Sequence, residues 1–303
     1  MVEHCESQHS LSHCQYTDIV ALRAIYSLRL PHHVPLEGSI SYEEVAKSAK
    51  VNELVLRRFF RYAITINYFR EPEANRVAHS AASRHLVEVP GAFDALGMKV
   101  EELVPASQKA IEGLQRWPQA EEPTETGYNI AHGTELPFYR ALAQQPERAR
   151  RFGAGMRYFT ERDNCDLSHL VGAFPWHEFD RADFTVVDVG GGHGGVSTRL
   201  ASETKQMRFV VQDLEGTAKV GSEILAPELK ERVSFMAHDF FTPQPVTADV
   251  YFLRWILHNW SDKYCVEILR SLVPGLKSGA RVLLYEYERE DAPENKLSRK
   301  DAK

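Results

Sequence analysis

The chain has 303 residues, of which 43% are hydrophobic and 26% are charged, and its formal net charge is −6. This composition predicts a globular protein with a large core, and the acidic balance argues against nucleic acid as a partner, because phosphate backbones attract basic surfaces. No apolar run approaches the roughly 18 residues of a membrane span, and the N-terminus has no apolar core of signal-peptide length. The four cysteines lie far apart and are expected to be free thiols. We therefore expect a cytoplasmic protein.

The first half of the chain has a helical pattern. Apolar residues recur at spacings of three and four along 17–30, and 41–69 is expected to form two helices joined by a turn near 49–53, followed by a short apolar strand. This order is typical of a winged helix. The polar segment 117–137, punctuated by Pro and Gly, is expected to be a surface loop, and 136–163 to be one helix.

From Phe184 onward, short β-branched runs alternate with helical stretches. The five runs are FTVVDV, RFVVQDL, VSFMAHDF, ADVYFLRWIL and ARVLLYEYE. Such alternation predicts an α/β fold with a doubly wound, mostly parallel Rossmann-like sheet and helices on both faces. We expect four parts: a helical winged-helix dimerisation domain at 1–115, a linker with central helices at 116–180, a ligand-binding sheet domain at 181–290 and a polar tail at 291–303.

A glycine turn, DVGGGHGG, occupies residues 188–195 after the first strand. Glycines allow positive φ and close backbone approach, so a small polar ligand can lie on the turn. The acid Asp188 suits a cationic or hydroxylated ligand better than a pyrophosphate. The next strand ends in Asp213, which can accept both hydroxyls of a ribose, and the third carries Asp239 and Phe240, suited to a flat base.

A ligand that combines an amino acid, a ribose and an adenine is S-adenosylmethionine. We expect it to lie over Gly190 and Gly192. An NAD site and a purely structural glycine turn are the alternatives. We expect no metal site.

The fourth strand runs into LHNWSD at 257–262. With the glycine turn, VVQDL and HDFF, this segment resembles the plant-type and fungal small-molecule O-methyltransferases, the caffeic acid O-methyltransferase-like family, from about residue 16 to 287. The resemblance implies His258 as general base, Arg254 and Leu214 as cofactor contacts, and Glu286, 28 residues after the histidine, as one of two flanking glutamates. The chemistry agrees, because an imidazole with a pKa near ~6.5 can accept the proton of a phenol with a pKa near ~10.

The resemblance also implies the acceptor and the assembly. The segment 136–163 is similar to the family's central helix, which implies that Phe138, Met156 and Phe159 line the acceptor; simple core packing is the alternative. The expected substrate is a phenolic or enolic hydroxyl of a small aromatic, polyketide-like secondary metabolite, and the expected assembly is a homodimer.

Two further expectations concern departures from this family. The chain is expected to be truncated at both ends, which would impair transfer. A non-methylating, cofactor-assisted pericyclase or cyclase, or an inactive cofactor-binding pseudoenzyme, is therefore the alternative on the same fold. A DNA-binding regulator is a rival from another class, suggested by Arg57, Arg58 and Arg61 and opposed by the acidic net charge.

Overall fold

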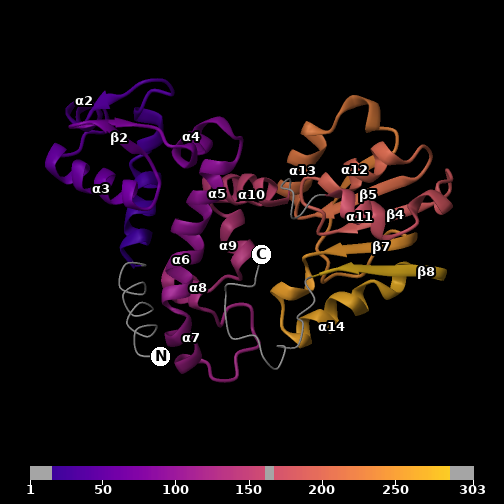
Figure 1. The fold of residues 1–303 in the computed structure, drawn as a ribbon. Helices are drawn as coiled ribbons and strands as arrows, with labels where there is room; N and C mark the ends of the chain where they lie inside the picture. Colours follow the sequence, from indigo (N-terminus) through magenta and orange to yellow (C-terminus); the bar gives the residue numbers. More distant parts are fainter. Residues whose placement is uncertain (1–15, 161–166, 287–303) are drawn as a thin grey trace, which may run out of the picture. The chain divides into compact units, whose positions relative to one another are not determined.

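The structure, a computed structural model, describes residues 16–160 and 167–286. The chain divides into two compact units, Met1–Asp166 and Leu167–Lys303, and the division falls inside the segment 116–180 that was expected to be a linker. In Figure 1 the first unit runs from indigo to magenta and the second ends in yellow. Cys265 is a free thiol. The other three cysteines lie outside the described residues.

The first unit opens with helices and a small antiparallel sheet, and its description as a winged helix stays a prediction. A helix at 16–27 is followed by η1 (Leu30–His33), β1 (Ile40–Ser41), α2 (Tyr42–Ala49), α3 (Glu53–Thr65), β2 (Arg70–Glu73) and β3 (Arg76–Ala78). The strands form an antiparallel sheet in the order β1-β3-β2. Helix α2 begins at a capping box between Ser41 and Glu44, and Asn52 caps α3. The expectation of an apolar strand after α3 is wrong, because the apolar stretch finishes α3 and a turn, and β2 is polar.

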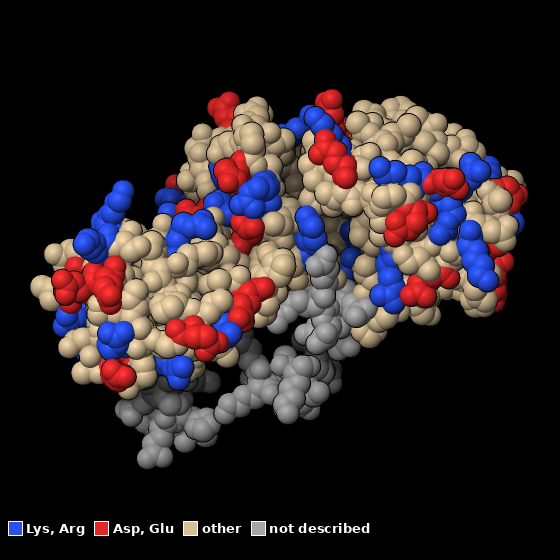
Figure 2. All heavy atoms as spheres, turned by 90° about the horizontal axis from the view of Figure 1, so that it is seen from above, with Lys and Arg blue, Asp and Glu red and all other residues tan. Residues whose placement is uncertain are grey.

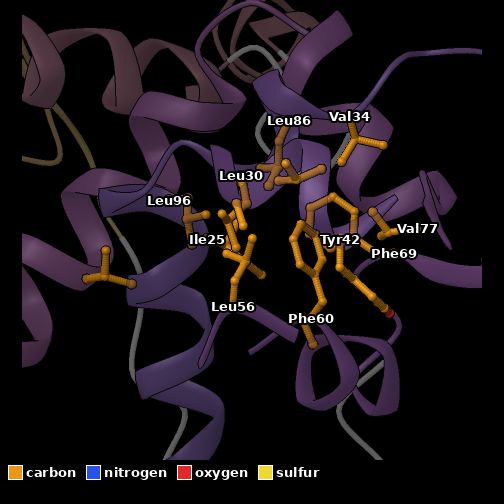
Figure 3. Packing of buried hydrophobic residues seen from close by; sticks show 14 of the residues in the cluster. Ile25, Leu30, Val34, Tyr42, Leu56, Phe60, Phe69, Val77, Leu86 and Leu96 are labelled. Carbon is orange, nitrogen blue, oxygen red and sulfur yellow. The ribbon is translucent and has the colours of Figure 1, made fainter. Parts of the chain in front are cut away.

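The core of this unit lies where the helices meet the small sheet. Figure 3 shows Ile25, Leu56 and Phe60 packed together with Tyr42 and Leu30. All five are at most 1% exposed. Burying such side chains stabilises a fold by about 1.5–3 kcal/mol each, so this cluster can hold the short helices and strands of this part together.

Seven α-helices and a π-helical segment complete the first unit within the described residues. They are α4 (Ala81–Glu88), α5 (Ala92–Met98), the π-helical η2 (Lys99–Leu103), α6 (Val104–Gln108), α7 (Ala110–Arg116), α8 (Gly127–His132), α9 (Phe138–Ala143) and α10 (Pro146–Thr160).

Two sequence expectations are wrong in this region. The segment 117–137 is not all loop, because Thr126 caps α8 and Asn129 donates its amide to two backbone carbonyls, those of Thr134 and Leu136, at 2.9 Å. The segment 136–163 holds two helices, α9 and α10, and α10 begins at Pro146. Proline has no N–H to donate and favours the first position of a helix, so it starts a new helix here.

The second unit is built on a five-stranded parallel sheet. Its elements are α11 (Leu167–Ala173), η4 (Trp176–Phe179), β4 (Thr185–Val189), α12 (Gly195–Glu203), β5 (Arg208–Asp213), α13 (Glu215–Ile224), η5 (Pro227–Leu229), β6 (Val233–Ala237), β7 (Ala248–Arg254), η6 (Leu257–Asn259), α14 (Asp262–Ser271), η7 (Val273–Gly275) and β8 (Leu276–Tyr285). The strand order is β6-β5-β4-β7-β8, and every neighbouring pair is parallel. The predicted doubly wound fold is confirmed.

Helices cover both faces of this sheet, as Figure 1 shows for α12 and α14. Val186 and Phe252 face Leu200 of α12, whereas Val187 and Leu253 face Ile268 of α14. The strand order reverses between β4 and β7, and in such sheets ligands bind outside the carboxyl ends of the strands at this point. The glycine turn follows β4, so it lies at that place.

The surface carries both signs of charge. On the face of the described residues seen in Figure 2, Lys and Arg are interspersed with Asp and Glu, without a continuous basic patch. On α3, Arg57 pairs with Glu53 and Arg61 pairs with Glu71. These acids neutralise two of the three arginines that suggested DNA binding. Within the described residues, we find no helix that is both long and apolar enough to cross a membrane.

Candidate active site

The glycine turn after β4 keeps its backbone open on one side. Gly190, Gly192 and Gly194 have φ of 67°, 61° and 79°, a region that L side chains rarely adopt. A Cβ at Gly190 would lie 2.6 Å from Cδ1 of Ile256, whereas a Cβ at Gly192 would meet no atom within 4 Å. The turn is therefore packed at Gly190 and open at Gly192, where a ligand can approach the main chain.

Asp188 lies beneath this turn. Its side chain is 2% exposed and accepts a hydrogen bond of 2.7 Å from Oγ of Ser197 on α12. Burial raises the pKa of the Asp188 carboxyl to about 6. A Cβ at Gly191 would lie 2.6 Å from Cγ of this aspartate, so the acid and the turn fit closely. Asp188 therefore packs against the glycine turn from below. Its predicted direct contact with the cofactor stays a prediction.

Asp213 at the end of β5 is tied to the same turn. Its Oδ2 accepts a hydrogen bond of 2.8 Å from the backbone N–H of Gly192, and its Oδ1 accepts one of 2.8 Å from that of Leu214. Burial raises the pKa of the Asp213 carboxyl, and these hydrogen bonds oppose the rise. An ionised carboxylate has about four acceptor positions, so Asp213 keeps capacity for a ligand hydroxyl beside the open Gly192.

The loop after β6 brings an aromatic ring to the turn. Cε1 of Phe240 would lie 3.6 Å from a Cβ at Gly190. Phe240 packs edge-on against Phe241 and Trp260, with ring centroids 4.9 and 5.9 Å away. The preceding Asp239 accepts a hydrogen bond of 3.1 Å from the backbone N–H of Phe241, which shapes the loop. Asp213 thus ends β5, and Asp239 and Phe240 follow the neighbouring strand β6 at the same edge of the sheet.

The residue that follows β7 has an unusual backbone conformation. Trp255 has φ of 56°, in the left-handed region, which costs a residue with a Cβ roughly 1–3 kcal/mol. The guanidinium of Arg254 lies over the Trp255 ring at 4.0 Å, and the Trp255 N–H donates to the carbonyl of Tyr285 at 3.1 Å. This bend turns the chain into η6, which carries His258.

His258 and Glu286 form a hydrogen-bonded pair. The His258 Nδ1–H donates to Glu286 Oε2 at 2.6 Å, because a carboxylate can only accept. Glu286 Oε1 accepts from the backbone N–H groups of Ile256 and Leu257, each at 2.8 Å. The glutamate therefore fixes both the imidazole and the loop that carries it. With the proton on Nδ1, Nε2 is free to act as a base, and the His258 side chain is 41% exposed.

The three predicted acceptor residues belong to the first unit, and the residues above belong to the second. Phe138 lies on α9, and its ring contacts Tyr128 and Phe152 edge-on at 4.7 and 5.2 Å. Met156 and Phe159 lie on α10, and all three predicted residues are partly exposed. Their role toward an acceptor stays a prediction.

Sequence reasoning missed two supporting residues, Ser197 and Ile256. Ser197 stands nine residues after Asp188 in the first turn of α12, and a hydroxyl at that place is the only signal the sequence offered. Ile256 closes on Gly190 from a different strand end, a contact with no local signal. Among the residues described, no three His, Cys, Asp or Glu side chains gather as a metal site would require.

The sequence of the chain is similar to those of known proteins. Residues 113–302 match the family model of the O-methyltransferase domain. The chain is 41% identical over 272 residues to the O-methyltransferase VdtC of Byssochlamys spectabilis. The aligned residues cover 88% of the chain and 62% of that protein. It is 37% identical over 277 residues to the chlorophenol O-methyltransferase of Trichoderma longibrachiatum, covering 90% of the chain and 59% of that protein. The chain thus spans about 60% of the length of these curated relatives.

Solved structures show the same fold. The mitomycin 7-O-methyltransferase MmcR superposes with a TM-score of 0.81 at 22% identity, covering 96% of this chain and 82% of that one. LepI in complex with SAM superposes with a TM-score of 0.73 at 24% identity, covering 94% and 73%. At these identities the likeness supports the fold.

Proposed function

The chain belongs to the O-methyltransferase domain family, and from this we propose that it transfers the methyl group of S-adenosylmethionine to a phenolic or enolic hydroxyl of a small aromatic metabolite. The observation that carries the proposal is the pair of His258 and Glu286, which lies at the carboxyl ends of β7 and β8. A histidine base held in one tautomer by a carboxylate suits the removal of a phenol proton.

The residues at the glycine turn fit S-adenosylmethionine. Gly192 leaves open space above the main chain, where the side chain of any other residue would stand. Asp213 lies beside that space with acceptor capacity for ribose hydroxyls, and Phe240 adds an apolar ring near the turn. Asp239 is assigned to the adenine and Arg254 to the cofactor on the resemblance. Structures of LepI with SAM, and of OxaC with SAH and oxaline, show these compounds bound to proteins of this fold.

When bound, S-adenosylmethionine supplies a methyl group already activated by the positive sulfur. The task of the chain is then to hold the acceptor oxygen in line with that carbon and to remove its proton. His258 Nε2 takes the phenol proton while the oxygen–methyl bond forms and the sulfur–methyl bond breaks. Glu286 stabilises the imidazolium that results, through the hydrogen bond to Nδ1.

The names of two relatives support the proposed acceptor class. VdtC and the chlorophenol enzyme are named as O-methyltransferases, and the second name states a phenolic substrate. The three candidate acceptor residues, Phe138, Met156 and Phe159, supply rings and a thioether that suit a flat aromatic compound.

The assembly is proposed to be a homodimer formed by the first unit. Apolar side chains stand exposed on its helices, with Ile111 at 66%, Leu114 at 61% and Tyr16 at 68% exposure. Burial of such side chains against a second copy stabilises a dimer. We place the protein in the cytoplasm, as its sequence predicts.

Methyl transfer and cofactor binding can be tested on the same preparations. Calorimetry measures S-adenosylmethionine binding, and mass spectrometry detects methylation of a chlorophenol and of a resorcinol-type acceptor. His258→Ala should abolish transfer and leave cofactor affinity unchanged, while His177→Ala, an exposed histidine of the same unit, serves as control. Cofactor binding without transfer to any phenol would overturn the proposal and favour the non-methylating alternative.

A further inference from the structure

A fully buried carboxylate lies in the π-helical segment of the first unit. Glu102 belongs to η2 and has a side chain that is 0% exposed. Such segments are rare and occur preferentially at functional sites. An ionised carboxylate can remain buried only if partners satisfy its charge and its lone pairs. The residues that do so come from two other helices, α8 and α10.

Two arginines of α10 provide the counter-charge. Arg148 donates from Nε to Glu102 Oε1 at 2.9 Å and from a second nitrogen to Oε2. Arg151 donates to Oε1 at 2.5 Å. Burial alone would raise the pKa of Glu102, but the hydrogen bonds from Arg148 and Arg151 outweigh it and lower the pKa. The carboxylate is therefore ionised and holds two guanidinium groups of one helix face, at i and i+3.

Both arginines extend the network to other helices. Arg148 donates to the hydroxyl of Tyr128 on α8 at 2.9 Å, and Arg151 donates to the hydroxyl of Tyr26 at 3.2 Å. His132, also on α8, lies 3.7 Å from Glu102 Oε2. Burial and the nearby Arg148 lower the pKa of His132, so its imidazole is neutral at pH 7. We call these six residues, Glu102, Arg148, Arg151, Tyr128, His132 and Tyr26, the Glu102 network.

The Glu102 network and its helical segment η2 contact the aromatic side chains that are proposed to line the acceptor. Tyr128 contacts the Phe138 ring at 4.7 Å, and Phe138 contacts Phe152 of α10 at 5.2 Å. At the other end of η2, the ammonium of Lys99 lies over the Phe159 ring at 4.9 Å. One short π-helical segment is thus connected to both aromatic residues, through a buried ion cluster on one side and a cation–π contact on the other.

We propose that Glu102 is a positioning residue for acceptor binding, which sets the separation of α8, α9 and α10 and thereby the placement of Phe138 and Phe159. The inference rests on the proposed function, because it takes these two rings as part of the acceptor site. Loss of the charge would leave two largely buried guanidinium groups of α10 without a counter-charge, so the link between η2 and α10 would weaken, and with it the link from Arg148 to Tyr128 on α8. The glycine turn and His258 belong to the other unit and make no part of this network.

The test compares Glu102→Gln with Glu101→Gln in the full chain. Glu101 is the matched control, because it is an adjacent acid that pairs with Arg23 at 3.3 Å outside the Glu102 network. Four quantities are measured: kcat and KM for a chlorophenol, the dissociation constant of S-adenosylmethionine, and amide hydrogen exchange in 127–132 and 146–160. Glu102→Asp, which keeps the charge, serves as the conservative variant.

For Glu102→Gln we expect the acceptor KM to rise about tenfold or more while kcat and cofactor affinity stay within about threefold. Exchange in both helices should rise about tenfold. Glu102→Asp should recover part of the KM, and Glu101→Gln should match wild type. An unchanged acceptor KM, or equal losses in acceptor and cofactor binding, overturns the inference.

Two cases need a further measurement: a variant that does not fold, and a wild type that methylates no phenol. If Glu102→Gln does not fold, Tyr128→Phe replaces it, because it keeps the ring against Phe138 but removes the hydroxyl that accepts from Arg148 in the Glu102 network. An acceptor KM equal to that of wild type then overturns the inference. If wild type methylates no phenol, the proposed function fails. Hydrogen exchange alone then decides whether Glu102 holds α8 and α10, and unchanged exchange refutes it.

Discussion

Replacing Glu286 with glutamine removes one charge from the pair with His258 and leaves the shape of the side chain almost unchanged. Glu286 accepts three hydrogen bonds, from the N–H groups of Ile256 and Leu257 at 2.8 Å and from His258 Nδ1 at 2.6 Å. The glutamine oxygen can keep the two backbone bonds. Its NH₂ group then faces Nδ1, and because this group only donates, the histidine must place its proton on Nε2.

The wrong tautomer cannot accept a phenol proton, so kcat should fall by about 10²- to 10⁴-fold, the range for loss of a general base. This corresponds to roughly 2.7 to 5.4 kcal/mol in the barrier. Binding of S-adenosylmethionine should stay unchanged, because Gly192 and Asp213 do not contact Glu286. The assay is single-acceptor kinetics on a neutral phenol, with calorimetry for the cofactor, and Glu267→Gln on the exposed face of α14 is the control.

A second acceptor sharpens the result. A nitrophenol that is already ionised at assay pH needs no base, so Glu286→Gln should methylate it far better, relative to wild type, than it methylates the neutral phenol. Turnover of the neutral phenol within about threefold of wild type would refute the reasoning. Equal losses for both acceptors would show that Glu286 acts on the loop and not on the tautomer.

Three more predictions follow from the described contacts. Asp213→Ala should weaken S-adenosylmethionine binding by about 1.5–3 kcal/mol, the contribution of hydrogen bonds to a charged group, and unchanged affinity in calorimetry would contradict the ribose assignment. The pKa of Asp188 is raised to about 6 in the folded protein from 3.8, so the folded state holds this proton more tightly, and the contribution of Asp188 to the free energy of unfolding is greatest below about pH 4 and is lost as pH rises through about 6. Asp188→Asn lacks this titration, so urea unfolding at pH 4 and pH 7.5 should show wild type losing up to roughly 3 kcal/mol relative to the variant, and a constant difference would disprove the pKa shift. Replacing Ile111 and Leu114 with glutamate should convert the proposed dimer into a monomer in light scattering, and a wild type that is already monomeric at micromolar concentration would contradict the dimer.

The sheet could be predicted from the sequence because its signals are local. Short β-branched runs, each followed by a turn or a helix, predicted all five strands, and the glycine turn indicated where a ligand can lie. The link between His258 and Glu286 came from a resemblance, and the structure brings the two side chains together across neighbouring strands. The predicted helix boundaries in 117–163 were wrong because Thr126 caps α8 and Pro146 begins α10. Neither residue was expected to lie at a helix end.

Contacts between distant segments could not be predicted. The pattern of Asp188 suggested a ligand contact, but the strand buries its side chain, and only the tertiary structure shows Ser197 beside it. Glu102 looks like one acid in a charged helix, EELV, until side chains from α8 and α10 surround its carboxylate. Burial of a charge depends on partners far along the chain, here 46 and 49 residues away, and no local pattern records them.

The parallel pairing of β7 with β8 also determines which length changes the candidate active site can tolerate. Arg254 stands opposite Tyr285 in that ladder, so the residue that follows each strand reaches the same edge. An insertion between α14 and β8 leaves this alignment intact, because the loop can absorb it. A single residue inserted within the regularly paired part of β8, residues 281–285, would shift the strand by one position and turn Glu286 to the opposite face, away from His258. Homologues should therefore vary in the number of residues that separate the two side chains, while the length from the paired part of each strand to its proposed catalytic residue stays constant.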